Sequence, residues 1–108
     1  MNKTRKANGL SPLKIKEEMV ITNPEAVSII FHEKKGEILK HLIYREMTLI
    51  DLKHATDLNP GTVKGHLTDL LEHDLVFISR ESVNEFKIVM KYYRASAKSF
   101  IFNIVWPK

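Results

Sequence analysis

The spacing of hydrophobic residues along the chain predicts helices in its first half and strands in its second. From Asn23 to Ile43, apolar residues recur every three or four positions, as expected for helices that bury one side. Asn23 followed by Pro24 fits the cap and the first position of a helix. Gly36 interrupts the pattern, which predicts either one helix with a break or two helices in sequence.

A short helix is predicted to begin after Thr48. Asp51 stands three positions later, where a capping box usually has Glu or Gln, so the two side chains can cap each other's backbone N–H groups. The residues predicted to form the inner face of this helix are Leu49, Leu52 and Ala55. The pattern ends near Thr56 and Asp57, which predicts a tight turn there.

The next helix is predicted to start at Asn59-Pro60 and to run to about Asp74. Asparagine and proline again match the cap and the first helical position. At 100° per residue, four apolar residues fall within about 80° of one another, and they therefore form one narrow stripe. These residues are Val63, Leu67, Leu70 and Leu71.

After Asp74 the pattern becomes typical of strands. Residues 75–78 and 86–93 are rich in β-branched and aromatic side chains, and residues 81–84 between them have turn character, which together predict a β-hairpin. In the tail, an extended backbone would place Phe100, Phe102, Ile104 and Trp106 on one side. This favours a strand, with a short helix as the alternative.

Helix, tight turn, helix and hairpin is the order of a winged helix, and the sequence agrees in detail. The segment TLIDLKHATDLNPGTVKGHLTDLLEHDLV resembles the helix-turn-helix of ArsR-like and MarR-like winged-helix transcriptional regulators. The segment Lys91–Arg94 resembles the end of the wing in archaeal members. The matched positions are Thr48, Leu49, Leu52, Leu58, Thr62, Val63, His66, Leu67, Leu70, Leu75 and Val76.

The resemblance implies an α+β, mainly α, winged helix-turn-helix fold with a β-hairpin wing and an extended C-terminal segment. It covers about residues 36–97 and places the helix-turn-helix at 48–73 and the wing at 75–94. The length and composition of the chain predict that these lie within a single domain that spans 14–108. Two departures concern turns, because Asp57 and Asp74 stand where the family commonly has glycine. Aspartate tolerates a left-handed backbone better than most residues, so we expect both turns to form.

The charge of the chain is distributed unevenly. Its net charge of +4 divides into +5 for residues 1–16, −5 for residues 17–78 and +4 for residues 79–108. Residues 1–13 lack apolar periodicity and are predicted to form a flexible basic arm. Basic ends on an acidic scaffold suit contact with a polyanion, although a solvated tail without a partner is the alternative.

The expected function is sequence-specific binding of double-stranded DNA by a homodimeric transcriptional regulator. The recognition helix would enter the major groove and the wing would contact the backbone. Gly65 costs roughly 1 kcal/mol relative to alanine inside a helix, which suggests close approach to a phosphate or groove wall. The candidate DNA-binding residues are Asn59, Gly61, Thr62, Lys64, Gly65 and Thr68 on the recognition helix, Arg80, Asn84 and Lys87 on the wing, and Lys3, Arg5 and Lys6 on the arm.

Two further classes of function stay open. The same fold can bind a protein partner, with its basic ends incidental. The second class is a metal or metabolite sensor, because the spacing of His66, Asp69 and His73 can hold a divalent ion on one side of the helix. The chain has no cysteine, so the thiolate ligands of the best-known metal sensors are missing, and we expect neither a metal site nor a cofactor.

Other classes are disfavoured by missing signals. The sequence has no glycine-rich phosphate loop, nucleophile elbow or recognisable carboxylate pair, so we expect no enzymatic activity. No apolar run approaches the ~20 residues of a membrane-spanning helix, and the basic N-terminus is not followed by the apolar core of a secretory signal. We therefore expect a cytoplasmic protein without a membrane partner.

Overall fold

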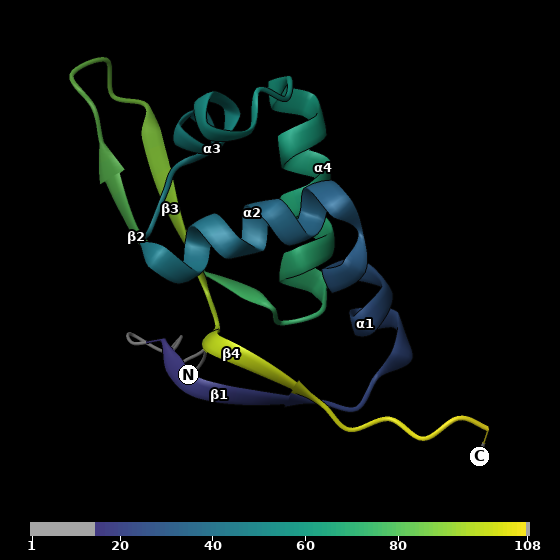
Figure 1. Cartoon of the computed structure of the whole chain (residues 1–108). Coiled ribbons are helices and arrows are strands. Elements are labelled where there is room, and N and C mark those ends of the chain that lie inside the picture. Colours follow the sequence, from purple (N-terminus) through teal and green to yellow (C-terminus); the bar gives the residue numbers. More distant parts are fainter. Residues whose placement is uncertain (1–14, 108) are drawn as a thin grey trace.

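The computed structural model describes residues 15–107, which form four helices and two small sheets (Figure 1). Strands β2 and β3 pair antiparallel as a hairpin, and β1 and β4 pair in parallel at the opposite end of the molecule. This arrangement confirms the predicted α+β fold with a β-hairpin wing. In chain order the elements are β1 (Lys16–Ile21), α1 (Pro24–Phe31), α2 (Glu33–Tyr44), α3 (Leu49–Thr56), α4 (Pro60–Glu72), β2 (Val76–Val83), β3 (Val89–Ala95) and β4 (Ala97–Phe102).

The three predicted helix starts are confirmed by their caps. The Asn23 side chain accepts a hydrogen bond from the backbone N–H of Glu25 at 2.9 Å. Thr48 and Asp51 form a reciprocal capping box, with hydrogen bonds of 3.0 and 3.1 Å. The Asn59 side chain accepts from the N–H of Thr62 at 2.8 Å. Such caps satisfy N–H groups that have no partner within the helix.

The first helical region consists of two helices, and the break lies at His32 rather than at Gly36. His32 has an extended backbone, and its ring nitrogen Nδ1 accepts from the N–H of Lys35 at 3.3 Å, which caps α2. Gly36 has a packing role, because a Cβ atom there would lie 2.5 Å from the carbonyl oxygen of Ile30. Glycine at this position therefore lets α2 pass close to the backbone of α1.

The core lies between α2, α3, α4 and the base of the wing. Val63, Leu67 and Leu70 of the predicted stripe are buried, and Leu71 at its edge is partly buried. They pack with Leu42 and other fully buried side chains, each of which contributes about 1.5–3 kcal/mol through removal from water. The inward side of α4 is therefore fixed, and its opposite side faces solvent.

The inner face of α3 differs from the prediction at one position. Leu52 is buried as expected, but Ala55 is exposed and Thr56 is buried instead. The hydroxyl of Thr56 donates a hydrogen bond of 2.7 Å to the carbonyl oxygen of Leu52, which satisfies its polar group inside the core. The prediction of Ala55 was wrong because it considered apolar residues only. It overlooked Thr56, which can be buried because its hydroxyl has a hydrogen-bond acceptor within the same helix.

The wing has its turn later than the sequence suggested. Residues 81–83 belong to β2, and the turn lies after them, so β3 begins at Val89 rather than near Phe86. The Asn84 side chain accepts from the N–H groups of Phe86 and Ile88 at 2.8 and 3.0 Å. Lys87 adopts a left-handed backbone with φ 65°, as do Asp57 and Asp74 with φ 58°. The two aspartate turns thus form as expected.

Strand β1 was not foreseen from the sequence. It pairs in parallel with β4, from Lys16 opposite Ala97 to Ile21 opposite Phe102. The predicted extended tail is confirmed as far as Phe102, beyond which the chain leaves the sheet. None of the helices in residues 15–107 has the length and apolar character needed to cross a bilayer.

Candidate nucleic-acid interface

The candidate residues of the recognition helix lie on the solvent-exposed side of α4. Gly61, Lys64, Gly65 and Thr68 are exposed, and Thr62 is partly exposed. Four of these five positions, all except Thr68, lie in the first half of the helix, at the same end of the molecule as α3 and the wing tip (Figure 1). The predicted helix face is therefore available to a ligand as large as a DNA duplex.

Gly65 differs from Gly36 in what surrounds it. A Cβ atom added at Gly65 would have no atom of the described residues within 4 Å, apart from its own helix. The internal packing that explains Gly36 therefore does not explain Gly65. A glycine in the exposed middle of a helix costs roughly 0.5–1 kcal/mol relative to alanine, with no structural gain visible within residues 15–107.

The wing presents its candidate residues in different ways. Lys87 lies at the tip and is exposed, whereas the Asn84 side chain is used to order the turn. Arg80 lies farther from the wing tip on β2, where its side chain contacts Glu46 and Tyr92. Lys91 on β3 was not among the candidates, yet it is exposed and borders the space between the wing and α4.

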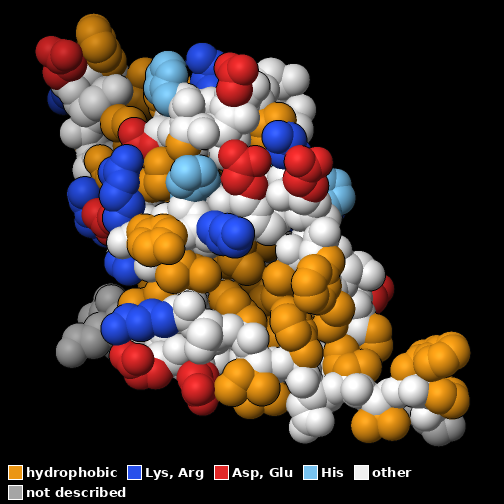
Figure 2. Space-filling view, viewed as in Figure 1, with side chains coloured by type: hydrophobic (Ala, Val, Ile, Leu, Met, Phe, Trp, Pro, Cys, Tyr) orange, Lys and Arg blue, Asp and Glu red, His pale blue; other side chains and the backbone are white. Residues whose placement is uncertain are grey.

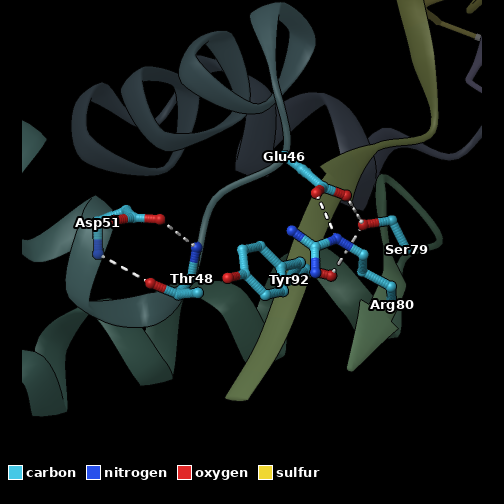
Figure 3. A network of polar contacts seen from close by, with 6 residues as sticks. All are labelled: Glu46, Thr48, Asp51, Ser79, Arg80 and Tyr92. Atoms are coloured by element: carbon cyan, nitrogen blue, oxygen red, sulfur yellow. Dashed lines mark hydrogen bonds and ion pairs between the residues drawn. The ribbon is translucent and has the colours of Figure 1, made fainter. Parts of the chain in front are cut away.

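Four side chains hold the base of the wing in place (Figure 3), and we call them the wing anchor: Glu46, Ser79, Arg80 and Tyr92. The Arg80 guanidinium pairs with the Glu46 carboxylate at 2.6 Å and lies 3.7 Å from the centre of the Tyr92 ring. The Ser79 hydroxyl donates to Glu46 at 2.8 Å. These contacts link the loop before α3 to both strands of the wing.

A β-bulge explains how Ser79 reaches Glu46. Ile78 pairs with Tyr93 and Arg80 pairs with Tyr92, which leaves Ser79 as the extra residue in β2. Bulges redirect side chains at such positions. The hydrogen bonds that Arg80 and Ser79 donate lower the pKa of the Glu46 carboxyl below its usual value, so this group is ionised at neutral pH.

Backbone contacts fix the wing relative to the helix-turn-helix. Met47 and Tyr93 exchange two hydrogen bonds, of 3.0 and 2.8 Å, one residue before the Thr48 cap of α3. On the other side of β3, the Arg94 guanidinium donates to the carbonyl oxygens of Leu42 and Ile43 at 3.0 and 3.1 Å, near the C-terminus of α2. The wing therefore has one fixed orientation relative to α3 and α4.

A hollow of about 480 Å³ separates the wing from the two helices. Ile50 of α3, Lys64 of α4 and Val89 and Lys91 of β3 are among the residues that line it. None of the ion pairs among the described residues involves Lys64, Lys87 or Lys91. Three lysines thus surround this end of the molecule with their charges available to an anion.

The histidines on α4 are not arranged for a metal ion. The Asp69 carboxylate forms a 2.6 Å ion pair with Lys35, and this hydrogen bond lowers the Asp69 pKa. His73 uses Nδ1 to contact the backbone oxygen of Asp69. Burial lowers the pKa of His66 below its usual value, and the nearby charges of His32 and Lys35 lower it further. Within residues 15–107, no three His, Asp or Glu side chains meet in a group that suits a metal.

The described residues carry little net charge of their own. Twelve of the 17 Lys and Arg residues and all 13 Asp and Glu residues lie within 15–107, which gives a net charge of −1. Basic and acidic side chains are interspersed over the upper part of the surface in Figure 2. The candidate residues Lys3, Arg5 and Lys6 lie outside the described residues.

Comparisons with known proteins bear on the fold. No protein-family model matches the sequence, and a comparison with curated proteins gives no significant match. Among solved structures, reduced HlyU from Vibrio cholerae matches 68% of this chain and 70% of its own, with a TM-score of 0.58 and 20% identity. A second structure of HlyU has a TM-score of 0.55 at 19% identity.

A further solved structure is the homodimeric winged helix-turn-helix DNA-binding domain of Mb0332 from Mycobacterium bovis, a possible ArsR-family transcriptional regulator. It matches 68% of this chain and 63% of its own, with a TM-score of 0.54 and 20% identity. At such identities the likeness concerns the arrangement of the backbone. From its elements and these neighbours, this protein has a winged helix-turn-helix fold.

Proposed function

We propose that this protein is a transcriptional regulator that binds duplex DNA sequence-specifically as a homodimer. Helix α4 would enter the major groove through its exposed side, and the wing would contact the adjacent backbone. The observation that carries this proposal is the exposed Gly61, Lys64, Gly65 and Thr68 side of α4, next to a wing held in one orientation. The Mb0332 domain, which has the same fold, is described as homodimeric and DNA-binding.

Small side chains on α4 suit close approach to DNA. Gly61 and Gly65 lack a Cβ atom on the side that would face the groove, so the helix backbone can lie nearer to bases and phosphates. Among the other candidates on this helix, Thr62, Lys64 and Thr68 offer polar side chains for contact with DNA. The exposed Asn59 side chain caps the helix by accepting from the N–H of Thr62, so it would act mainly by holding the start of α4 in place. Because so few groups can read base edges, the shape of the DNA would supply part of the specificity.

The wing would contribute phosphate contacts through Lys87 and Lys91. Arg80, which the sequence suggested for this role, is better explained as part of the wing anchor, because Glu46 already neutralises it. Asn84 likewise orders the turn that presents Lys87. Both residues would then act on DNA through the position of the wing rather than by direct contact.

The basic arm would add to the electrostatic attraction. Residues 15–107 carry a net charge of −1, whereas residues 1–13 contribute Lys3, Arg5 and Lys6 without an acid. Binding to a polyanion is driven largely by the counterions that such cations release. The arm would therefore raise affinity for any DNA, and α4 would choose among sequences.

The direct test is a binding assay with the DNA upstream of the coding sequence, with random duplex as competitor. Lys64→Ala should weaken binding by about 1–3 kcal/mol and leave the melting temperature nearly unchanged, since Lys64 is exposed and outside the apolar stripe. Lys98→Ala is the matched control, because this exposed lysine lies on β4 at the opposite end. Equal effects of the two substitutions would contradict the proposed orientation on DNA.

One observation favours a second candidate function, a winged helix that binds a protein. The described residues are nearly neutral, and the hollow beside the wing is lined by apolar side chains such as Ile50, Ile88 and Val89. Salt separates the two functions. DNA affinity should fall steeply with salt, whereas an apolar protein contact should hardly change.

A further inference from the structure

An apolar groove lies between the first two helices and the lower sheet. It has a volume of about 480 Å³ and runs between α1, α2 and β4. Its apolar lining consists of Ile30, Phe31, Leu39, Ile43 and Phe100. Figure 2 shows hydrophobic side chains exposed in a band between α2 and the lower sheet, where a monomer would leave them in water.

The C-terminal tail, residues 103–106, is a second exposed apolar feature. The N–H of Asn103 donates a hydrogen bond of 2.9 Å to the carbonyl oxygen of Ile21 at the end of β1. Beyond it Val105 is 70% exposed and Trp106 is 90% exposed. The tail runs away from the helices, and its hydrophobic end stands clear of the body (Figures 1 and 2). Within one copy of the protein, the tail therefore does not fill the groove between α1, α2 and β4.

We propose that the groove of each copy receives the tail of a second copy, with Trp106 packed against Phe31. This inference rests on the homodimer of the proposed function and names the surface that forms it. The groove and the tail belong to one chain, so a single two-fold axis can satisfy both copies reciprocally. This reciprocal binding of tails, which we call the exchange, removes both the apolar groove and the apolar tail from water.

The area available agrees with a stable dimer. Phe31 is 71% exposed and Trp106 is 90% exposed, and aromatic side chains bury about 150–250 Å² each. Two copies of both residues would then remove about 500–800 Å² from water. The two rings cover each other, so the further area that brings the total above about 1,000 Å², the size of a specific interface, comes from the remaining apolar lining of the groove and from Val105.

The position of the groove is compatible with DNA binding. The tail leaves the molecule beside α1, whereas the wing projects from the opposite side and α4 begins at the upper end (Figure 1). A partner docked on the tail side would leave Lys64 and Lys87 of both copies free.

Trp106 is the only tryptophan of the chain and reports on its own burial. We expect its fluorescence emission to shift to shorter wavelength as the protein concentration rises through the dimer dissociation constant, because the exchange transfers the indole from water into the groove. Light scattering on the same samples should show dimers over the same concentration range. A blue-shifted emission in samples that light scattering shows to be monomeric would mean that the tail folds into its own groove, and it would overturn the proposal.

Paired substitutions identify the surface. Phe31→Ser should raise the dimer dissociation constant by about tenfold or more, as expected for a central aromatic residue. Phe86→Ser is the matched control, because Phe86 is 73% exposed at the wing and should not affect self-association. Trp106→Ser gives a second variant with unaffected folding, since this side chain is almost fully exposed in one copy. Circular dichroism verifies that all three variants fold.

The outcomes separate this inference from the proposed function. Loss of the dimer in Phe31→Ser and Trp106→Ser, but not in Phe86→Ser, supports the exchange. A wild-type dimer that persists in both variants overturns the exchange and leaves the homodimer in place. A wild-type protein that stays monomeric at concentrations where it binds DNA overturns the exchange and the homodimer together, while the DNA-binding proposal stands on its own assay.

Discussion

Gly65 allows the contribution of α4 to folding to be separated from its contribution to DNA binding. It lies in the middle of an exposed helix face, and an added Cβ would meet no atom of the described residues within 4 Å. Gly65→Ala therefore introduces one methyl group without a clash. The substitution improves the helix and, on our proposal, places the methyl against DNA.

The expected magnitudes follow from this geometry. Alanine is favoured over glycine inside a helix by about 0.8–1 kcal/mol, so the free energy of unfolding should rise by roughly that amount. DNA affinity should fall by about 1 kcal/mol, or about fivefold, because the methyl keeps the helix backbone from its closest approach to the groove. Stability and binding should thus change in opposite directions.

Gly36→Ala serves as the contrast. A Cβ there would lie 2.5 Å from the backbone oxygen of Ile30, which cannot move without separating α1 from α2. The helix gain of about 1 kcal/mol is outweighed by overpacking, and we expect a net loss of about 1–2 kcal/mol in the free energy of unfolding. Its DNA contacts should be unaffected under conditions where the variant is folded.

Urea denaturation measures the free energy of unfolding of each variant, and fluorescence anisotropy with a labelled duplex measures its DNA affinity. A Gly65→Ala protein that is more stable and binds DNA as tightly as wild type would refute the placement of this face against DNA. A Gly65→Ala protein that is less stable would refute the structural premise that the position faces open solvent.

Three other predictions concern the core, the wing and the arm. Leu67→Ala should lower the free energy of unfolding by about 2–5 kcal/mol in urea denaturation, because Leu67 is 1% exposed, and a cost far below this would contradict the packing of α4. Glu46 has a lowered pKa in the folded state, so its stabilisation is complete above its usual value of 4.5 and is lost as pH falls below it. Glu46→Gln should therefore reduce the urea midpoint at neutral pH and make it less sensitive to acid, and an unchanged pH profile would count against the wing anchor. Deletion of residues 1–13 should make the slope of log DNA affinity against log salt concentration less steep by roughly 2–3 units. An unchanged slope would mean that the arm makes no phosphate contacts.

The helix starts could be read from the sequence because each depends on neighbours. A cap needs one polar side chain and an N–H group two or three residues later, as Asn23, Thr48 and Asn59 show. The apolar stripe of α4 is equally local, since a regular helix determines which positions share a side. These features sufficed to predict the helix-turn-helix and which side of α4 would face solvent.

The role of Arg80 could not be read in this way. Its partner Glu46 is 34 residues away in sequence, and the two meet only because Met47 pairs with Tyr93 at the base of the wing. An arginine near a predicted turn looks free to bind phosphate until that pairing is known. Glu46 and the bulge at Ser79 gave no local signal for the same reason.

The position of the hairpin turn could be predicted from the sequence only in part. Asn84 has turn character in the sequence, and it does order the turn. The left-handed backbone at Lys87 has no such signal, because lysine rarely adopts it. The strand register, which pairs Val83 with Val89, decides which residues bend.

The helices, their caps, the exposed side of α4 and the basic character of the first 16 residues follow from the sequence, because each depends on residues close together in the chain. The pairing of β1 with β4 becomes evident only in the folded chain, since this parallel pair joins segments about 80 residues apart. It likewise decided that Gly36 serves packing while Gly65 faces open solvent. Two glycines on predicted helices look alike in sequence, and they differ only in which backbone passes beside them.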